Sequence, residues 1–383
     1  MNEKSSTSQR IAVVGAGAFG GWTALYLHRK GATTTLVDAW GPGNSRASSG
    51  GESRVIRGTY GPDFIYTDMV ARALALWRDH EELWGIELYK KCGVLWMTGP
   101  NDAFEKASLP VLREAGLQFE EWSVAEAAKR YPQINFEGIN WVIHEPEAGY
   151  LLARRACQAV LQGFLAEGGV YRQLAAKPGR IEEGHLRLIE LSDGSVLEAD
   201  QFVFACGPWL GQLFPDVLGD LIRPTRQEVY YFGTPAGDSD FHEDVFPAWA
   251  DRGTRRMYGI PGSEWRGFKI ADDNHGTDFN PTRGERTLTL ANLEAARKYV
   301  GFRFPALEGA PLVEARVCQY ENTPDGHFIV DKHPDADNVW VVGGGSGHGF
   351  KHGPALGERV AETVIGERPV DPFFAISRFS KTG

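Results

Sequence analysis

The sequence is poor in three features that would assign it to particular classes of protein. It holds only four cysteines in 383 residues and no C-x-x-C pair, so neither a disulfide framework nor a zinc site is predicted. No apolar run approaches the roughly 20 residues that a membrane-spanning helix needs. Acidic residues outnumber basic ones, 50 to 40, and the net charge of −10 disfavours nucleic acid or an anionic membrane as a partner. Any anionic ligand must therefore be held by local positive charge.

The two ends of the chain carry no recognisable address. The opening MNEKSSTSQR is polar and lacks the apolar core of a secretory signal, and the closing SKTG is not the peroxisomal tripeptide SKL. We therefore expect a cytoplasmic protein. With 42% hydrophobic residues, a chain of 383 residues is too long for one compact core, which predicts two domains that can be interleaved.

A dinucleotide-binding fingerprint lies near the start of the chain. The apolar run 11–14 predicts a buried strand, and Gly15, Gly17 and Gly20 follow it in the spacing G-x-G-x-x-G. These glycines permit a tight turn, close approach of a pyrophosphate, and close packing of the next helix on the strand. A second strand then ends in Asp38, where an acid binds a ribose hydroxyl. Strand, glycines, helix, strand and acid in this order predict a Rossmann-type cofactor domain.

Apolar periodicity predicts the elements that follow this fingerprint. Spacing of three and four residues predicts a helix over 64–84, whereas alternation predicts a hairpin of strands at 186–191 and 196–197. Further elements are predicted at 93–98, 124–131, 141–144, 202–207, 339–342 and 354–365. We interpret Glu145 and Glu147 as a polar turn rather than an acid–base pair, and Cys206 as a small buried residue within a strand.

The second half of the chain predicts a different kind of sheet. From residue 222 onward, strands rich in aromatic and β-branched residues indicate an antiparallel sheet in a substrate domain. The predicted fold class is therefore α/β, or α+β with two domains. A Rossmann-type FAD-binding domain is expected from the separated segments 1–80, 146–221 and 321–383. The substrate-binding domain, with a mixed or antiparallel sheet, is expected from 81–145 and 222–320.

Four motifs in this order resemble one family of flavin enzymes. They read SSGGESRVIR at 48–57, YGIP with GFKI at 258–270, ARVCQYENTPDGHFIV at 315–330, and GGGSGHGFK at 343–351. The sequence resembles monomeric sarcosine oxidase and N-methyltryptophan oxidase, amine oxidases of the wider D-amino-acid-oxidase-like group. The resemblance extends from about residue 11 to residue 366.

This resemblance implies roles for particular side chains. It places Arg54 beside the flavin ring and Arg57, together with Lys351, around the substrate carboxylate. Lys269 is expected to activate dioxygen, because a fixed ammonium stabilises the negative charge that develops there. Two tyrosines complete the expected pocket. Tyr258 is expected to be a catalytic residue, and Tyr320 is expected to line the substrate site.

The resemblance also implies that FAD is bound covalently, through a thioether between Cys318 and the 8α carbon of the flavin. The glycine-rich turn before the last helix is expected to present backbone N–H groups to the pyrimidine end of the flavin. The predicted cofactor-binding residues are Gly15, Gly17, Gly20, Asp38, Ser48, Ser49, Cys318, Gly344, Gly347, His348, Gly349 and Lys351.

Two positions depart from the family pattern, which has a histidine at each. Here they are Gly50, whose small size is compatible with extra room in the pocket, and Asp273. His348 and His352 lack a further partner at metal-ligand spacing, so no metal is expected.

The predicted activity is oxidation of a secondary or N-substituted amino acid to an imine, with release of hydrogen peroxide. Alternatives are oxidation of a fructosyl amino acid or of a cyclic imino acid such as pipecolate or proline. A dehydrogenase with another electron acceptor, or a flavin-holding protein in a biosynthetic complex, also stays open. We expect a small carboxylated amine and dioxygen as partners, and a monomer or weak oligomer.

Overall fold

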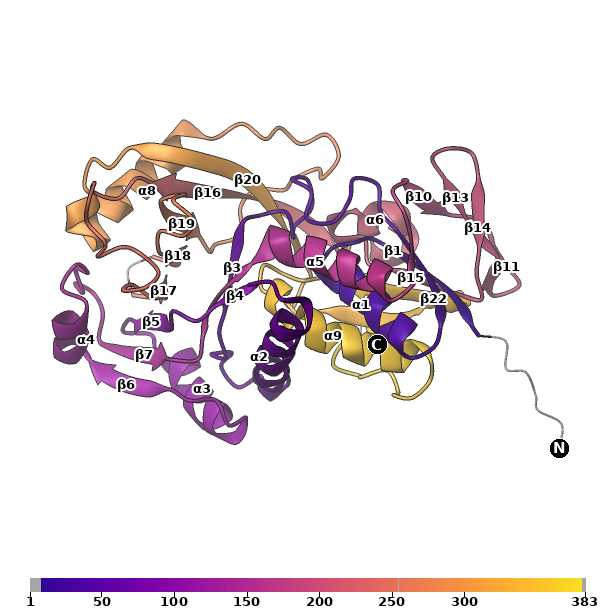
Figure 1. The fold of residues 1–383 in the computed structure, drawn as a ribbon, viewed down its shortest axis with the longest axis horizontal. Helices are drawn as coiled ribbons and strands as arrows, with labels where there is room; N and C mark the ends of the chain where they lie inside the picture. The colour runs from indigo at the N-terminus through magenta and orange to yellow at the C-terminus, as the bar shows by residue number, and fades with distance from the viewer. Residues whose placement is uncertain (1–7, 254, 381–383) are drawn as a thin grey trace.

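The fold is built from two large sheets at opposite ends of an elongated molecule (Figure 1). The computed structural model of the chain describes residues 8–253 and 255–380. Residues 1–7 and 381–383 lie outside the described residues. The expectations that the chain has no secretory signal and no peroxisomal tripeptide depend on these segments. Within the described ranges, no helix has both the length and the apolar character needed to span a bilayer.

A six-stranded sheet brings together the start, middle and end of the chain. Its order is β21-β22-β15-β1-β2-β9, parallel except for the pair β21 and β22. The strands are β1 (Arg10–Val14), β2 (Thr33–Val37), β9 (Val170–Arg172), β15 (Gln201–Phe204), β21 (Ile329–His333) and β22 (Ala336–Gly343). Figure 1 shows β1, β15 and β22 side by side in different chain colours. A Rossmann-type sheet assembled from discontinuous segments is therefore confirmed.

Helices cover this sheet because parallel strands are apolar on both faces. Ile11 to Val14 are all buried, and α1 (Ala18–Arg29) follows directly after the glycine turn. It packs against α5 (Ala153–Ala166) and α9 (Gly353–Val364). The helix α2 (Phe64–Trp84) packs against α9. The predicted range of α2 is confirmed at both ends.

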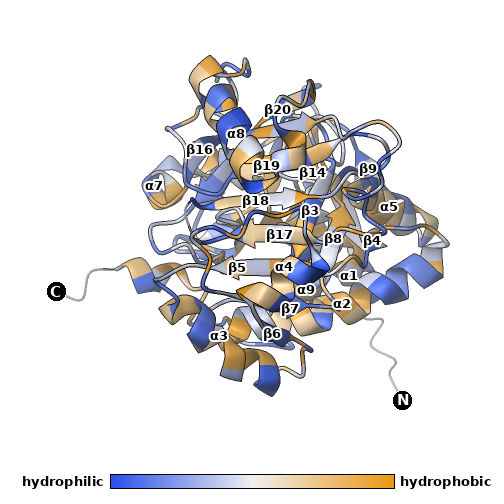
Figure 2. Cartoon of the chain, turned by 90° about the vertical axis from the view of Figure 1, so that its left-hand side faces the viewer, coloured by the Kyte–Doolittle hydropathy of each residue, from blue (hydrophilic) through white to orange (hydrophobic). Residues whose placement is uncertain are grey.

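The second large sheet has eight strands in the order β20-β16-β19-β18-β17-β5-β7-β6. All neighbours are antiparallel except β17 and β5, so the expected mixed sheet is confirmed. Figure 2 shows the strands from β19 to β6 stacked in this order. The strands are β5 (Val94–Thr98), β6 (Glu120–Ser123), β7 (Trp141–Glu145), β16 (Arg223–Phe232), β17 (Ala248–Asp251), β18 (Met257–Ile260), β19 (Phe268–Asp272) and β20 (Leu312–Asn322).

An aromatic core packs against one face of this sheet, beneath α8 (Leu290–Arg303). Phe268 and Trp249 point into it from the strands, and Phe304 follows the helix. A buried ion pair crosses the same core: Asp251 accepts from the Arg303 guanidinium at 2.7 Å and from the Tyr299 hydroxyl at 2.6 Å. Both charged side chains are 0% exposed, so this pair fastens α8 to β17.

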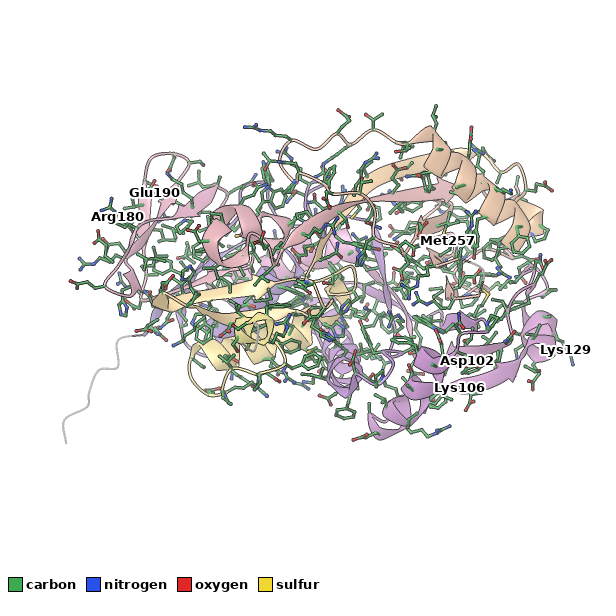
Figure 3. All side chains as sticks on the ribbon, turned by 180° about the vertical axis from the view of Figure 1, so that it is seen from behind. Asp102, Lys106, Lys129, Arg180, Glu190 and Met257 are labelled. Carbon is green, nitrogen blue, oxygen red and sulfur yellow. The ribbon has the colours of Figure 1, made fainter. Side chains whose placement is uncertain are left out.

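Three small sheets and several short helices complete the molecule. Figure 3 shows Asp102 and Lys106 side by side at the outer edge, where the two side chains are joined at 2.9 Å. The small sheets are β3 (Ser53–Ile56) with β8 (Gly149–Leu152) and β4 (Tyr89–Lys90), β10 (Ala176–Pro178) with β13 (Leu188–Leu191) and β14 (Val196–Glu198), and β11 (Ile181–Glu182) with β12 (His185–Leu186). The remaining helices are α3 (Ala103–Glu114), α4 (Val124–Arg130), α6 (Leu210–Leu213), α7 (Pro215–Leu218) and the 3-10 turns at Gly207–Trp209, Pro305–Leu307, Phe350–His352 and Ile376–Phe379.

Two local interpretations from the sequence are wrong. Cys206 does not lie within a strand, because β15 ends at Phe204 and the cysteine, half-buried, precedes a 3-10 turn. Glu145 is not part of the predicted polar turn, since it is the last residue of β7 and is 3% exposed. Glu147 does lie in the expected polar turn, where it pairs with Arg78.

Candidate cofactor and substrate site

One cavity of about 660 Å³ joins the two large sheets. It begins at the carboxyl ends of the parallel strands, where open α/β sheets bind their ligands, and continues to the inner face of the mixed sheet. Most of the predicted site residues line it: Gly15, Gly17, Asp38, Ser48, Ser49, Arg54, Arg57, Tyr258, Tyr320, Gly347, His348, Gly349 and Lys351. Four predicted residues are not among those that line it: Gly20, Lys269, Cys318 and Gly344.

The fingerprint glycines permit contacts that any side chain would block. Gly15 has φ +105°, and a Cβ there would lie 2.3 Å from the carbonyl oxygen of Ala205. A Cβ on Gly20 would lie 1.9 Å from the carbonyl oxygen of Gly15. The strand, turn and helix are therefore packed backbone to backbone, which aims the free N–H groups of α1 into the cavity.

Asp38 lies on the cavity wall with part of its bonding capacity in use. One carboxylate oxygen accepts from the backbone N–H groups of Trp40, at 2.8 Å, and Gly41, at 2.7 Å. The other accepts from the N–H of Ala16 at 2.8 Å. A carboxylate has about four acceptor positions. One position is left for a ligand hydroxyl, which agrees with the role predicted for this residue.

Two serines connect the fingerprint to the loop that follows. Ser49 Oγ accepts from the N–H of Ala18 at 3.1 Å and so holds this loop against the start of α1. Ser48 Oγ is buried without a hydrogen-bond partner, although its residue lines the cavity. Because buried hydroxyls are nearly always bonded, this atom indicates a missing polar ligand. The residues present therefore fit a dinucleotide such as FAD.

Arg54 links this loop to Cys318. Its guanidinium donates to the carbonyl oxygens of Ser53, at 2.8 Å, and Ser48, at 2.6 Å. From that fixed position it also lies 3.5 Å from Cys318 Sγ on β20. The fold thus brings together Arg54 and Cys318, which lie 264 residues apart in the sequence. Arg54 is the residue predicted to lie beside the flavin ring, and Cys318 is the residue predicted to attach to the flavin.

Lys269 is buried behind this part of the wall. Its ammonium donates to the Ser53 carbonyl at 2.7 Å and lies 5.8 Å from the centre of the Tyr258 ring. On β19 its side chain alternates with Phe268 and Ile270, which face the aromatic core, so Lys269 faces the cofactor side. Burial, followed by the charge of Arg54, lowers the pKa of Lys269 well below its usual value.

Two cations meet at the substrate end of the cavity. The Arg57 guanidinium is sandwiched between the rings of Tyr60 and Trp96, 4.5 Å from each ring centre. The Lys351 ammonium donates to the Tyr60 hydroxyl at 2.7 Å. Burial, and then the charge of Arg57, lowers the pKa of Lys351 well below its usual value. Tyr60 therefore contacts both residues predicted to hold a carboxylate, and sequence reasoning missed it.

A histidine and a carboxylate support these cations from behind. His352 Nε2 lies 2.8 Å from the Tyr60 hydroxyl and fixes the orientation of that group. Glu145 accepts from the N–H of Gly58 at 2.6 Å and from the Thr59 hydroxyl at 2.6 Å. It thereby holds the loop that carries Arg57. No local pattern marks either role, because each contact joins distant parts of the chain.

The two departures from the family pattern have different consequences. Gly50 does not widen the pocket: it is not on the cavity wall, and a Cβ there would lie 1.9 Å from the carbonyl oxygen of Asn44. The small size of Gly50 therefore adds no room to this cavity. Asp273 does line the cavity, where it pairs with Arg252 at 3.2 Å. Burial raises the pKa of Asp273, although Arg252 opposes this.

Among the residues that the structure describes, no group of three or more histidine, cysteine, aspartate or glutamate side chains is placed to hold a metal ion. His348 instead has Nε2 3.0 Å from the carbonyl oxygen of Gly326, and its Nδ1 lies 3.3 Å from the Tyr60 hydroxyl. All four cysteines are free thiols.

Known proteins resemble this chain over nearly its whole length. Curated relatives include peroxisomal sarcosine oxidase of Mus musculus, 28% identical over 96% of this chain and 95% of its own length. Monomeric sarcosine oxidase of Streptomyces avermitilis is 29% identical over 94% of each chain. Among solved structures, L-proline dehydrogenase from P. horikoshii superposes with a TM-score of 0.85 at 19% identity, over 98% of both chains.

The structural neighbours also include the deglycating fructosamine oxidase Amadoriase II of Aspergillus fumigatus, with a TM-score of 0.80 at 20% identity, over 97% of this chain and 90% of its own. At such identities the superpositions show a shared fold. The model of the family described as FAD dependent oxidoreductase (DAO) matches residues 10–363. Because this match runs through both large sheets and not through the fingerprint alone, the chain belongs to the FAD dependent oxidoreductase (DAO) family.

Proposed function

We propose that this FAD-dependent oxidoreductase oxidises secondary amines that carry a carboxylate, and that dioxygen is its final electron acceptor. The observation that carries the proposal is the pair Arg57 and Lys351 on one cavity wall. Burial lowers the pKa of Lys351 well below its usual value, and repulsion from the charge of Arg57 lowers it further. A bound carboxylate would offset this repulsion. Similarity to sarcosine oxidases supports an N-methyl amino acid as the substrate.

The residues of the chain supply binding and orientation for this reaction. Bound FAD would supply a hydride acceptor for the carbon beside the amine, and the resulting imine would be hydrolysed by water. Arg57 and Lys351 fix the carboxylate, so that the amine and its neighbouring C–H are held in one orientation. Tyr258 and Tyr320 line the same space, and burial raises the pKa of Tyr258 to about 12, so its hydroxyl stays protonated near neutral pH.

Lys269 and Arg54 act in the second half of this reaction, in which dioxygen reoxidises the flavin. Both are cations at the start of strand β3, since each donates to the carbonyl oxygen of Ser53. Positive charge held there stabilises the negative charge that dioxygen acquires as it takes electrons, and hydrogen peroxide is then released.

We further propose that Cys318 attaches FAD covalently through a thioether. Replacing Cys318 with serine should leave FAD bound but release it into the supernatant when the protein is precipitated with acid. The Arg54 guanidinium, 3.5 Å from Cys318 Sγ, would then bond a hydroxyl instead of a sulfur. Cys157→Ser, at a buried cysteine on α5, is the matched control and should keep the flavin in the pellet. Flavin that stays in the Cys318→Ser pellet would place the attachment elsewhere.

Replacing Tyr60 with phenylalanine should raise the KM for a carboxylated amine by about 10-fold, because Lys351 loses an acceptor while the ring under Arg57 is kept. Steady-state kinetics measures this effect. The KM for the methyl ester of the same amine should change much less. Tyr26→Phe, which removes a buried hydroxyl without a partner on α1, is the control and should leave both values unchanged. Equal effects on acid and ester would remove Tyr60 from carboxylate binding.

The proposed function is tested by mixing the oxidised protein, without air, with a panel of amines and following the loss of flavin absorbance. Sarcosine, N-methyltryptophan, pipecolate, proline and fructosyl-glycine represent the candidate classes, and simple amines lack the carboxylate. Rapid bleaching by one carboxylated amine is expected. Bleaching by carboxylate-free amines alone, or by none of the panel, would contradict the proposal.

A further inference from the structure

A buried carboxylate, Glu321, faces the cavity with most of its bonding capacity unused. It lies on β20, is 7% exposed and lines the cavity. One carboxylate oxygen accepts from the N–H of Gly345 at 3.1 Å, and the other has no hydrogen-bond partner among the described residues. Burial raises the pKa of Glu321 to about 7, and the Gly345 N–H opposes this. An acceptor left unbonded in such a place is costly unless a ligand satisfies it.

Neighbouring glycines keep this carboxylate accessible to the cavity. A Cβ on Gly207, in the turn after β15, would lie 2.8 Å from the unpartnered oxygen. A Cβ on Gly345, in the turn after β22, would lie 3.0 Å from the bonded oxygen. Both turns line the cavity as well. The backbone of Glu321 is also fixed, since its carbonyl oxygen accepts from the N–H of Ser346 at 3.1 Å.

The position of Glu321 along the cavity identifies the part of FAD that it meets. Glu321 lies three residues beyond Cys318 on the same strand, which is about 10 Å. Gly345 adjoins Phe19 of the fingerprint, because a Cβ there would lie 3.7 Å from the Phe19 ring. Glu321 is therefore between the proposed ring attachment and the pyrophosphate turn. FAD carries its ribityl chain, a polyol, between these two groups.

We propose that Glu321 is a cofactor-binding residue whose unpartnered oxygen accepts a hydrogen bond from a ribityl hydroxyl of FAD. In its ionised form the Glu321 carboxylate only accepts hydrogen bonds, and a polyol offers hydroxyl donors without adding charge. This role is independent of the amine substrate and requires only that the protein binds FAD.

The test compares FAD with ADP, which shares the adenosine and diphosphate of FAD but has no ribityl chain. The full-length protein carries Cys318→Ser and is made in riboflavin-starved cells, so that binding starts from the FAD-free state. Titration calorimetry then measures both ligands on this parent and on its Glu321→Leu and Glu321→Gln derivatives. ADP binding also reports whether each variant is folded.

Glu321→Leu should bind FAD about 10- to 100-fold more weakly than the parent and should bind ADP equally well, because a hydrogen bond to a charged group is lost. Glu321→Gln keeps a carbonyl acceptor and should lose less FAD affinity than Glu321→Leu. Unchanged FAD affinity in Glu321→Leu would overturn the proposal. Equal losses of FAD and ADP affinity would also overturn it, since the effect would then lie in the shared part of the two ligands.

Discussion

Replacing Lys269 with methionine should slow the reaction of reduced flavin with dioxygen by about 100- to 1000-fold, the range seen when one preorganised charge-stabilising group is removed. Methionine keeps the length of the side chain but not its charge. Reduction of the flavin by the amine should change only a few-fold, because Lys269 does not line the cavity. Stopped-flow measurement of the two half-reactions separates these effects. Equal slowing of both would remove Lys269 from the oxygen reaction.

The pH dependence gives a second readout of the same residue. Burial and Arg54 lower the pKa of Lys269 well below its usual value, so its charge is lost at a lower pH than that of an exposed lysine. Because the protonated form is the active one, the rate of reoxidation should fall as pH rises through this lowered pKa. Lys269→Met should lack that fall. Lys332→Met, at an exposed lysine on β21, should keep it.

Replacing Asp251 with alanine should lower the free energy of unfolding by about 3–5 kcal/mol, because the Arg303 guanidinium is 0% exposed and loses its buried carboxylate. The Tyr299 hydroxyl loses the same acceptor. Denaturant unfolding followed by tryptophan fluorescence measures the change.

Glu294→Ala, at an exposed position on the same helix, is the control and should change stability by no more than about 0.5 kcal/mol. If Asp251→Ala unfolds at the same denaturant concentration as this control, the ion pair does not fasten α8 to β17.

Local pattern was sufficient where an element is specified by its own residues. The fingerprint strand and helix follow from glycine spacing and apolar runs, and the range of α2 follows from helical periodicity. Strand β8 was missed because it has only four residues and takes its pairing from β3 and β4, which precede it by many residues. Cys206 was misplaced for a similar reason, since strand length is set by neighbouring strands and not by the apolar run alone.

The site shows the same limit. The family resemblance predicted roles for Arg57 and Lys351. Tyr60 comes close to Lys351 only in the folded chain, where a hydrogen bond joins two residues that are 291 positions apart. The small size of Gly50 is compatible with extra room in the pocket, but the nearby Asn44 carbonyl, which no sequence pattern reveals, is the reason for a glycine there. Supporting contacts such as that of His352 depend on how distant segments pack.

The most direct measurement of the central claim is the rate of air-free flavin reduction by an N-methyl amino acid and by its methyl ester, in the wild type and in Arg57→Ala. Arg57 lies on the cavity wall, stacked between two rings, with Lys351 bonded to one of them. In the wild type the acid should be favoured over the ester by about 10- to 100-fold, as a charge-assisted hydrogen bond predicts. In Arg57→Ala this preference should largely disappear because the acid becomes slower. An acid preference that survives the substitution would contradict the account.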